Sequence, residues 1–221
     1  MREILPGCRD TSMETPMKWE VRRSRYVLED RWIRVRADDC VNPRGTEISP
    51  FYVLEYRDFA HVVATDAQDR VVLVRLYRHG RGEVSLELPG GIMNPGETNP
   101  VAAGLRELQE ETGYTGGTAR KLLTLAPNPA NFSNGLHLIR VEGATAGPRQ
   151  IDEAEETEVV LLSREEALAA ARSGGMLNAQ HVGLLFLALT ASAPSSRSET
   201  VEVAAPADPE PGQPRPDWLR R

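Results

Sequence analysis

The stretch from Gly91 to Tyr114 reads GIMNPGETNPVAAGLRELQEETGY and decides how the rest of the chain is interpreted. Its first part is rich in glycine and proline and predicts a loop. Its second part opens with Asn99, which can cap a helix, and with Pro100, which suits the first helical position. Gly113 suits the end of that helix. The segment therefore predicts a loop followed directly by a helix.

Two faces of this helix differ in chemistry. Apolar residues at i, i+4 and i+7 form one stripe, namely Val101, Leu105 and Leu108. Glu107, Glu110 and Glu111 fall at i, i+3 and i+4 on a different face, where like charges weaken a helix by about 0.2–0.5 kcal/mol per pair. A Mg²⁺ ion would offset that repulsion, since it takes carboxylate oxygens and usually bridges to substrate phosphates. The alternative is a solvated acidic face, which is the usual meaning of clustered glutamates.

The remaining chain predicts one mixed α/β domain with additions at both ends. Short apolar or alternating runs predict strands at 32–37, 51–56, 62–65, 71–76, 84–88, 121–126, 136–141 and 158–162. Ser163 and Glu166 form a capping-box signal for a second helix, and 178–189 predicts a buried third helix.

These elements divide the chain into four parts. We expect a disordered leader at 1–17, a β extension at 18–58, the main domain at 59–190 and a disordered tail at 191–221. The tail is rich in Ser, Pro and Ala and has too little apolar surface to fold alone.

Composition argues against several classes of protein. The 221 residues hold 26 Lys and Arg against 32 Asp and Glu, and the resulting net charge of −6 argues against a nucleic-acid binder, which tends to be basic. A basic run from Arg22 to Arg36 alternates with apolar residues and is interpreted as the solvated face of a sheet rather than an RNA site. The two cysteines, Cys8 and Cys40, form no CxxC motif, which argues against a disulfide framework or a cysteine zinc site.

Targeting signals are also missing from the sequence. Residues 1–18 lack the apolar core of a signal peptide. The longest apolar run, around 182–189, is far short of the roughly 20 residues of a membrane span. We therefore expect a soluble cytoplasmic protein without a membrane partner.

The loop and helix resemble the Nudix box, which is a Gly, five residues, a Glu, seven residues, Arg-Glu, an aliphatic, any residue, Glu-Glu, any residue, a Gly and an aliphatic. The matching residues are Gly91, Glu97, Arg106, Glu107, Leu108, Glu110, Glu111 and Gly113. Two positions depart from the pattern: eight residues instead of seven separate Glu97 from Arg106, and Tyr114 replaces the aliphatic. The extra residue most simply lies at 98–100, before the helix, so the helical spacing of the glutamates is kept.

This resemblance implies a fold, an activity and a metal site. The fold would be an α/β/α sandwich with a mixed sheet, carrying the N-terminal antiparallel β extension. Members hydrolyse a nucleoside diphosphate linked to another moiety, using Mg²⁺ or Mn²⁺. By position, the implied metal ligands are Glu107 and Glu111, with Glu110 on a further metal or a metal-bound water and with the Gly90 carbonyl. Arg106 would pair with Glu97 and hold the loop against the helix.

The flanks of the box are similar to ADP-ribose pyrophosphatases and related nucleotide-sugar hydrolases, in Tyr77–Gly80 and in Leu86–Gly91. In that branch Arg78 would contact the substrate phosphates, and Pro129 matches a proline that follows the box. The alternatives are a solvent-facing arginine and a plain loop proline. The β extension of that branch commonly forms an intertwined homodimer, with substrate bound across both subunits.

The reaction that the resemblance implies is attack of water on a phosphorus of the diphosphate, giving AMP and ribose 5-phosphate from ADP-ribose. By position the general base would be Glu153, in the acidic run 152–158, with Glu155 the nearest rival and Glu110 the candidate within the box helix. Other substrates are GDP-mannose, NADH or an RNA cap. A non-catalytic nucleotide-sensing domain is a further alternative, although such domains usually lose the box glutamates that this chain keeps.

Overall fold

A mixed sheet forms the centre of the larger part of the protein. The computed structural model of the chain describes residues 18–148, 157–190 and 200–203. The main strands are β4 (Phe59–Asp66), β5 (Val71–Arg78), β9 (Gly117–Leu125), β10 (Leu136–Ala146), β11 (Thr157–Leu162) and β12 (Thr200–Val203). Their order is β11-β5-β4-β10-β9-β12, and β4 and β10 run parallel while the other neighbours are antiparallel.

Three short strands attach to the sides of this sheet. β6 (Glu83–Glu87) pairs with β5, β7 (Gly90–Ile92) pairs with β4, and β8 (Tyr114–Thr115) pairs with β10. The pairing of β7 with β4 places Gly90 opposite His61. The start of the predicted loop is thereby attached to the central strand of the sheet.

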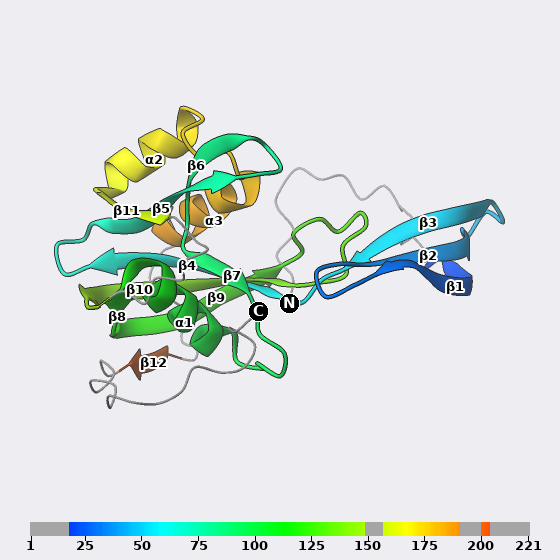
Figure 1. Cartoon of the computed structure of the whole chain (residues 1–221), viewed down its shortest axis with the longest axis horizontal. Helices are drawn as coiled ribbons and strands as arrows, with labels where there is room; N and C mark the ends of the chain where they lie inside the picture. Colours follow the sequence, from blue (N-terminus) through cyan, green and yellow to red (C-terminus); the bar gives the residue numbers. More distant parts are fainter. Residues whose placement is uncertain (1–17, 149–156, 191–199, 204–221) are drawn as a thin grey trace, which may run out of the picture. The chain divides into compact units, whose positions relative to one another are not determined.

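Helices cover both faces of the sheet (Figure 1). α1 (Pro100–Thr112) packs on one face, where Leu108 joins a buried cluster with Val62 and Ile139. α2 (Arg164–Arg172) and α3 (Ala179–Thr190) pack on the other, where Leu185 joins Val63 in a second cluster. Successive residues of β4 point to opposite faces, so the strand contributes to both clusters. The predicted α/β/α sandwich with a mixed sheet is confirmed.

The caps of α1 form as the sequence predicts. The Asn99 side chain accepts hydrogen bonds from the N–H groups of Val101 and Ala102, at 2.9 and 3.3 Å. Gly113 ends the helix in a left-handed conformation, with φ of 75°, and its N–H donates to the Gln109 carbonyl. α1 begins at Pro100, so Glu107, Glu110 and Glu111 all lie within one continuous helix and keep their helical spacing.

A glycine inside α1 brings the helix close to the sheet. A Cβ atom at Gly104 would lie 3.0 Å from Val62 Cγ2 and 3.2 Å from Ile139 Cδ1. Glycine weakens a helix interior by about 1 kcal/mol relative to alanine. At position 104 the missing side chain lets α1 lie close to β4 and β10, at the cost of this loss in helix stability.

The N-terminal strands form a separate three-stranded antiparallel sheet. Its members are β1 (Glu20–Glu29), β2 (Arg34–Val41) and β3 (Glu47–Glu55), in the order β1-β2-β3. The described residues up to Tyr56, together with Asn128–Ser133, form one compact unit, and Arg57–Pro127 with the described residues from Asn134 onward form the other. We call them the N-terminal unit and the main unit.

The boundary between the units differs in detail from the division at residue 58. A loop segment from between β9 and β10 belongs to the N-terminal unit, because Leu54 N–H donates to the Asn131 carbonyl at 2.8 Å and Ser133 N–H donates to the Leu54 carbonyl at 3.2 Å. Such long-range backbone pairing has no local sequence signal.

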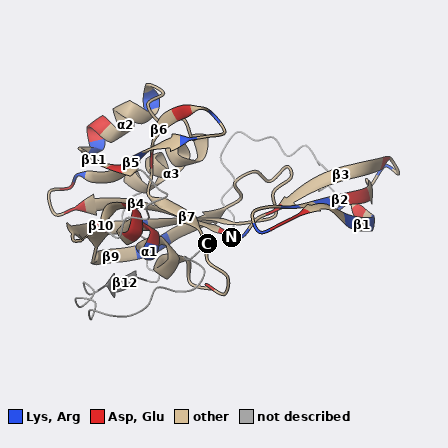
Figure 2. Ribbon diagram, in the orientation of Figure 1, with Lys and Arg blue, Asp and Glu red and all other residues tan. Residues whose placement is uncertain are grey.

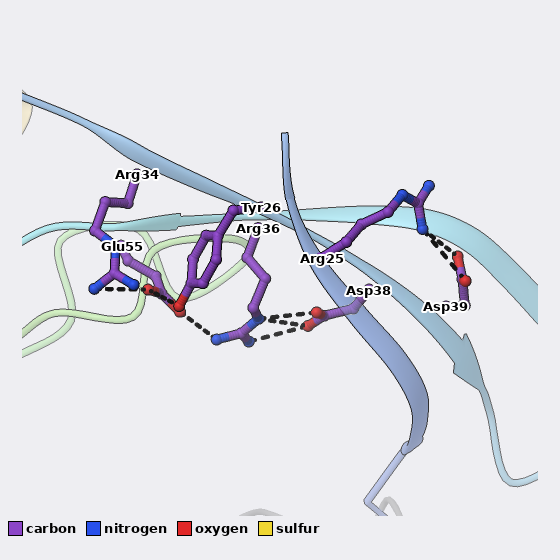
Figure 3. Close-up of polar contacts among 7 residues, drawn as sticks. All are labelled: Arg25, Tyr26, Arg34, Arg36, Asp38, Asp39 and Glu55. Carbon is purple, nitrogen blue, oxygen red and sulfur yellow. Dashed lines mark hydrogen bonds and ion pairs between the residues drawn. The ribbon is translucent and has the colours of Figure 1, made fainter. Parts of the chain in front are cut away.

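The basic run of the N-terminal unit is matched by acidic side chains on the same sheet (Figure 3). Arg36 Nε donates to Asp38 Oδ1 at 2.8 Å and the same guanidinium pairs with Glu55, while Arg25 donates to Asp39 at 3.2 Å. The hydrogen bond from Arg36 lowers the pKa of Asp38. The mixture of signs in Figure 2 agrees with a solvated sheet face.

The tail contains a strand that its composition does not predict. Within the tail from residue 191, Thr200–Val203 form β12, which pairs antiparallel with β9. Val201 and Val203 alternate with polar residues in the sequence, a pattern that suits a strand. The edge of β9 supplies the backbone hydrogen-bonding partner that a single strand needs. β12 thus lies within the segment 191–221 for which the composition predicts a disordered tail. Among the described helices, none has the length and apolar character needed to cross a membrane.

Candidate active site

Arg106 lies at the centre of a cluster of glutamates on α1 and on the loop before it. Its Nε donates to Glu97 at 2.9 Å, and its terminal nitrogens lie 2.9 Å from Glu107 Oε1 and 2.8 Å from Glu110 Oε2. The predicted pair of Arg106 and Glu97 is therefore present, and it joins the loop to the helix. Figure 2 shows the acidic residues of α1 in red.

The charges in this cluster reinforce one another. The hydrogen bond from Arg106 lowers the pKa of Glu97 and keeps it ionised. Burial alone would lower the pKa of Arg106, but the hydrogen bond to Glu97 and the charges of Glu107 and Glu110 outweigh burial and raise it. The sequence predicts that a bound cation offsets the repulsion among Glu107, Glu110 and Glu111. Arg106 already offsets part of that repulsion within the chain.

Two of the three box glutamates lie against the backbone of β7. Gly90 N–H donates to Glu111 Oε2 at 2.9 Å. A Cβ atom at Gly91 would lie 2.9 Å from the carboxylate atoms of Glu107, so only the absence of a side chain admits that carboxylate. Glu110 instead pairs with Arg106. The structure therefore brings Glu107 and Glu111 to the Gly90–Gly91 backbone and places Glu110 beside the arginine.

This arrangement fits a hard divalent cation. Within residues 18–148, 157–190 and 200–203, no three His, Cys, Asp or Glu side chains converge as a metal site. Mg²⁺ does not require three, since it is usually held by one or two carboxylates, with waters and substrate phosphates as its other ligands. Glu107 and Glu111 beside a glycine backbone supply that donor set, and the Gly90 carbonyl is a further oxygen on the same turn.

A second charged feature lies at the end of β5. Arg78 donates to buried Glu87 through Nε at 3.0 Å and through a terminal nitrogen at 2.7 Å. The Glu87 side chain is only 2% exposed, whereas that of Arg78 is 46% exposed. Both residues line a recess of about 320 Å³ together with His79, Arg81 and Asn178. Arg78 thus presents a fixed guanidinium to an open pocket, which suits a phosphate.

Two buried histidines lie behind Glu87. His181 Nδ1 accepts a hydrogen bond from Leu88 N–H at 3.2 Å, and the His61 and His181 rings are 4.4 Å apart between centroids. Burial and then the charge of Arg78 lower the pKa of His181 to about 3. Burial and then His181 lower the pKa of His61 well below its usual value. Both rings are neutral at ordinary pH.

Glu87, His61 and His181 are not among the site residues predicted from the sequence. One signal for two of them is visible in the sequence. Glu87 interrupts an apolar strand, and His181 is the one ionisable residue in the apolar segment from Ala179 to Thr190. Buried charged or ionisable groups are normally paired, so each indicates a partner elsewhere in the fold. Only the three-dimensional structure shows which residue that partner is.

The remaining predicted residues belong to different units or lie outside the described residues. Pro129 belongs to the N-terminal unit, within Asn128–Ser133, and Arg78 belongs to the main unit. Glu153 and its rival Glu155 lie outside the described residues. The roles of all four stay predictions.

Comparison with protein-family models gives two matches. Residues 55–179 match the NUDIX domain, and residues 19–54 match the nucleoside diphosphate sugar hydrolase N-terminal domain. The main-sheet elements from β4 to β11 and the three glutamates of α1, Glu107, Glu110 and Glu111, lie inside the first match. The three strands of the N-terminal sheet coincide almost completely with the second.

Individual relatives give the same result. The chain is 31% identical over 160 residues, which is 72% of this chain and 76% of that protein, to a CMP-5'-(N-acetyl-N-hydroxy-3-aminopropyl)phosphonate hydrolase of Streptomyces rubellomurinus. It is 26% identical to an ADP-ribose pyrophosphatase of Bacillus subtilis, covering 70% of this chain and 83% of that protein. It is 29% identical to an ADP-sugar pyrophosphatase of Mus musculus, covering 63% and 69%.

A solved structure shares the fold. A crystal structure described as an ADP compounds hydrolase matches with a TM-score of 0.68 and 22% sequence identity, over 79% of this chain and 94% of that one. The structural match, the family model over more than half of the chain and the geometry of the box agree. The chain belongs to the NUDIX family.

Proposed function

We propose that the protein hydrolyses the diphosphate bond of ADP-ribose or a similar nucleotide sugar, with Mg²⁺ or Mn²⁺ as cofactor, to a nucleoside monophosphate and a sugar phosphate. The observation that carries this proposal is the placement of Glu107 and Glu111 against the Gly90–Gly91 backbone. The names of the relatives from Bacillus subtilis and mouse support an ADP-sugar as the substrate class. We also propose that the protein is located in the cytoplasm.

Each box residue has a distinct task in this reaction. Glu107, Glu111 and the Gly90 carbonyl would hold the cation, and Glu110 would bind a second metal or a water. When bound, a divalent cation lowers the pKa of a coordinated water and neutralises charge on the phosphoryl oxygens. Arg106 keeps Glu97 ionised and pairs with Glu107, which holds both carboxylates in place.

The other groups act on the substrate. Arg78 would pair with the diphosphate from the edge of its recess. Pro129 is proposed as a substrate-binding residue on the resemblance alone. Glu153 would take the proton of the attacking water as its oxygen bonds to phosphorus. The bond from that phosphorus to the bridging oxygen breaks, and the second phosphate leaves with the bonding electrons.

A hydrolysis screen tests this function. The substrates are ADP-ribose, other ADP-sugars, GDP-mannose, NADH and a capped RNA, each with Mg²⁺ and with Mn²⁺. A CMP-linked phosphonate belongs in the screen because the Streptomyces rubellomurinus relative is named for one. Turnover of ADP-ribose above the others supports the proposal. Tight nucleotide binding without any turnover supports the nucleotide-sensing alternative.

Replacing Glu153 with Gln is expected to lower kcat by about 10²-fold, the lower end of the range for a lost general base. KM should change little, because the proton moves only in the transition state. The measurement is steady-state hydrolysis of ADP-ribose at saturating Mg²⁺, with Glu155→Gln and Glu156→Gln as matched variants. If Glu155→Gln alone loses kcat, the base lies two residues later. If none of the three does, Glu110 becomes the candidate.

A homodimer through the N-terminal unit is part of the proposal. All ten residues of β1 are exposed in the single chain, and so are large apolar side chains of this unit, among them Val21 at 53% and Trp32 at 72%. A second copy would bury them. Among the described strands of the N-terminal sheet, β1 also presents a sheet edge.

Light scattering at micromolar concentration is therefore expected to give twice the mass of one chain. Val21→Glu should shift the protein toward the monomer, because it places a charge at a position where an exposed apolar side chain would be buried by the second copy. Val84→Glu is the matched control, since Val84 is a comparably exposed valine of the main unit at 59%. A wild-type protein that is monomeric at this concentration would refute the dimer.

A further inference from the structure

Two buried histidines pack against the turn formed by residues 88–90, where β6 leads into β7. His61 comes from β4 and His181 from α3, and they are 8% and 1% exposed. Their rings lie 4.4 Å apart between centroids, at 60°. The pair thus connects a helix on one face of the sheet to the central strand.

Both histidines contact the backbone between Leu88 and Gly90. Leu88 N–H donates to His181 Nδ1 at 3.2 Å. A Cβ atom at Gly90 would lie 2.6 Å from His61 Nδ1, so this ring lies against the Gly90 backbone. The Pro89 carbonyl accepts a hydrogen bond from Val62 N–H at 2.9 Å. Every residue of the turn is therefore held by the sheet or by α3.

The chemistry of His181 points to its role as an acceptor. With its pKa lowered to about 3, the ring is neutral and carries its proton on Nε2, which leaves Nδ1 to accept from Leu88 N–H. The 3.3 Å approach of Nδ1 to Glu87 Oε2 is then not an ion pair.

The other ring nitrogen of His181, Nε2, lies in a different environment from Nδ1. In the part of the chain that the structure describes, Nε2 of His181 is buried and has no hydrogen-bond partner. A buried polar group without a partner destabilises a protein. An aliphatic side chain would fill the same space without that cost, so the bond made by Nδ1 is the feature that distinguishes histidine here.

We propose that His181 is a positioning residue for the cation site: its Nδ1 holds Leu88 N–H and thereby fixes the Gly90 carbonyl beside Glu107 and Glu111. The inference rests on the proposed function, which assigns those groups as cation ligands. His181 touches neither the cation nor the substrate. It acts through the backbone of the turn.

Two variants separate this role from simple filling of the core. Asparagine places its side-chain oxygen close to where histidine has Nδ1, so His181→Asn can still accept from Leu88 N–H. His181→Leu has a similarly branched side chain but no acceptor. Both remove the imidazole ring, so a loss that comes only from packing should be at least as large in His181→Asn.

The experiment is a titration of the full-length protein with Mn²⁺ alone, followed by calorimetry or by the electron paramagnetic resonance of free Mn²⁺. His181→Leu is expected to weaken Mn²⁺ binding by about 10-fold, the lower end of the range for residues that support metal ligands. His181→Asn should stay close to wild type. Amide hydrogen exchange at Leu88 should accelerate in His181→Leu only.

The control is Leu185→Ala, which truncates another buried residue of α3. Equal weakening of Mn²⁺ binding in Leu185→Ala and His181→Leu would overturn the inference, because general destabilisation would then explain both. Unchanged binding in His181→Leu would also overturn it. Failure of the wild-type protein to bind Mn²⁺ would instead overturn the proposed function on which the inference rests.

Discussion

Replacing Glu111 with Gln is expected to lower kcat/KM for ADP-ribose by on the order of 10³-fold at saturating Mg²⁺, since removing one preorganised electrostatic group alone costs about 10²–10³. Glu111 Oε2 accepts from Gly90 N–H at 2.9 Å, so this carboxylate both faces the proposed cation and fixes the backbone beside it. Glutamine keeps the length of the side chain but removes its charge. The cation would lose a ligand while the helix remains.

The control for this variant is Glu165→Gln, which removes an exposed carboxylate from α2. Thermal unfolding of both variants shows whether the fold is kept, and a Mn²⁺ titration shows whether the cation is lost. Turnover near the wild-type value in Glu111→Gln would disprove the assignment of the box carboxylates. A similar loss in both variants would point to a general effect of charge.

The parts of this site that the sequence predicts are those with local signals. Asn99, Pro100 and Gly113 cap α1 through contacts within a few residues, and the spacing of the glutamates sets their common face. The pair of Arg106 with Glu97 also lies within one loop and one helix. Short-range hydrogen bonding and helical geometry determine all of these features.

The parts that the sequence does not predict depend on long-range contacts. Glu110 differs from Glu107 and Glu111 because it contacts Arg106, whereas β7 lies against the other two carboxylates, of which Glu107 also contacts Arg106. The pairing of Arg78 with Glu87 is not predictable from strand alignment. In the register of β5 with β6, Val74 and not Arg78 lies directly opposite Glu87, so the long Arg78 side chain reaches Glu87 from further along β5. The strand β12 and the segment Asn128–Ser133 likewise have partners far away in the sequence.

Gly90→Ala is expected to destabilise the main unit and to abolish cation binding with it. Gly90 has a φ of +145°, and a Cβ there would lie 2.4 Å from the Ala60 carbonyl oxygen and 2.7 Å from His61 Cα. Both atoms belong to the backbone of the central strand and cannot move aside. Strain of about 1–3 kcal/mol and overpacking of about 1–3 kcal/mol would together lower Tm by on the order of 10 °C in a unit of this size.

Gly91→Ala is the matched variant, because its conflict is with a side chain. A Cβ at Gly91 would meet the carboxylate of Glu107 at 2.9 Å, and the backbone at Gly91 lies outside the left-handed region that only glycine adopts easily. Glu107 can swing away by rotating its side chain, so Tm should stay near the wild-type value. Moving the carboxylate should still weaken Mn²⁺ binding by about 10–100-fold, the range for loss of support around a metal ligand.

The two glycines therefore separate stability from cation binding. Differential scanning calorimetry and a Mn²⁺ titration on both variants form the test. If Gly91→Ala binds Mn²⁺ as the wild type does, the carboxylate of Glu107 is not held for a cation by this backbone. If Gly90→Ala keeps the wild-type Tm, the turn is not fixed against β4 as its geometry indicates. The two positions differ in backbone φ and in which atoms face them, backbone of β4 at Gly90 and the Glu107 carboxylate at Gly91. A loss of Tm confined to Gly90 would therefore locate the structural constraint at the sheet, and a loss of Mn²⁺ binding in Gly91→Ala would locate the chemical one at α1.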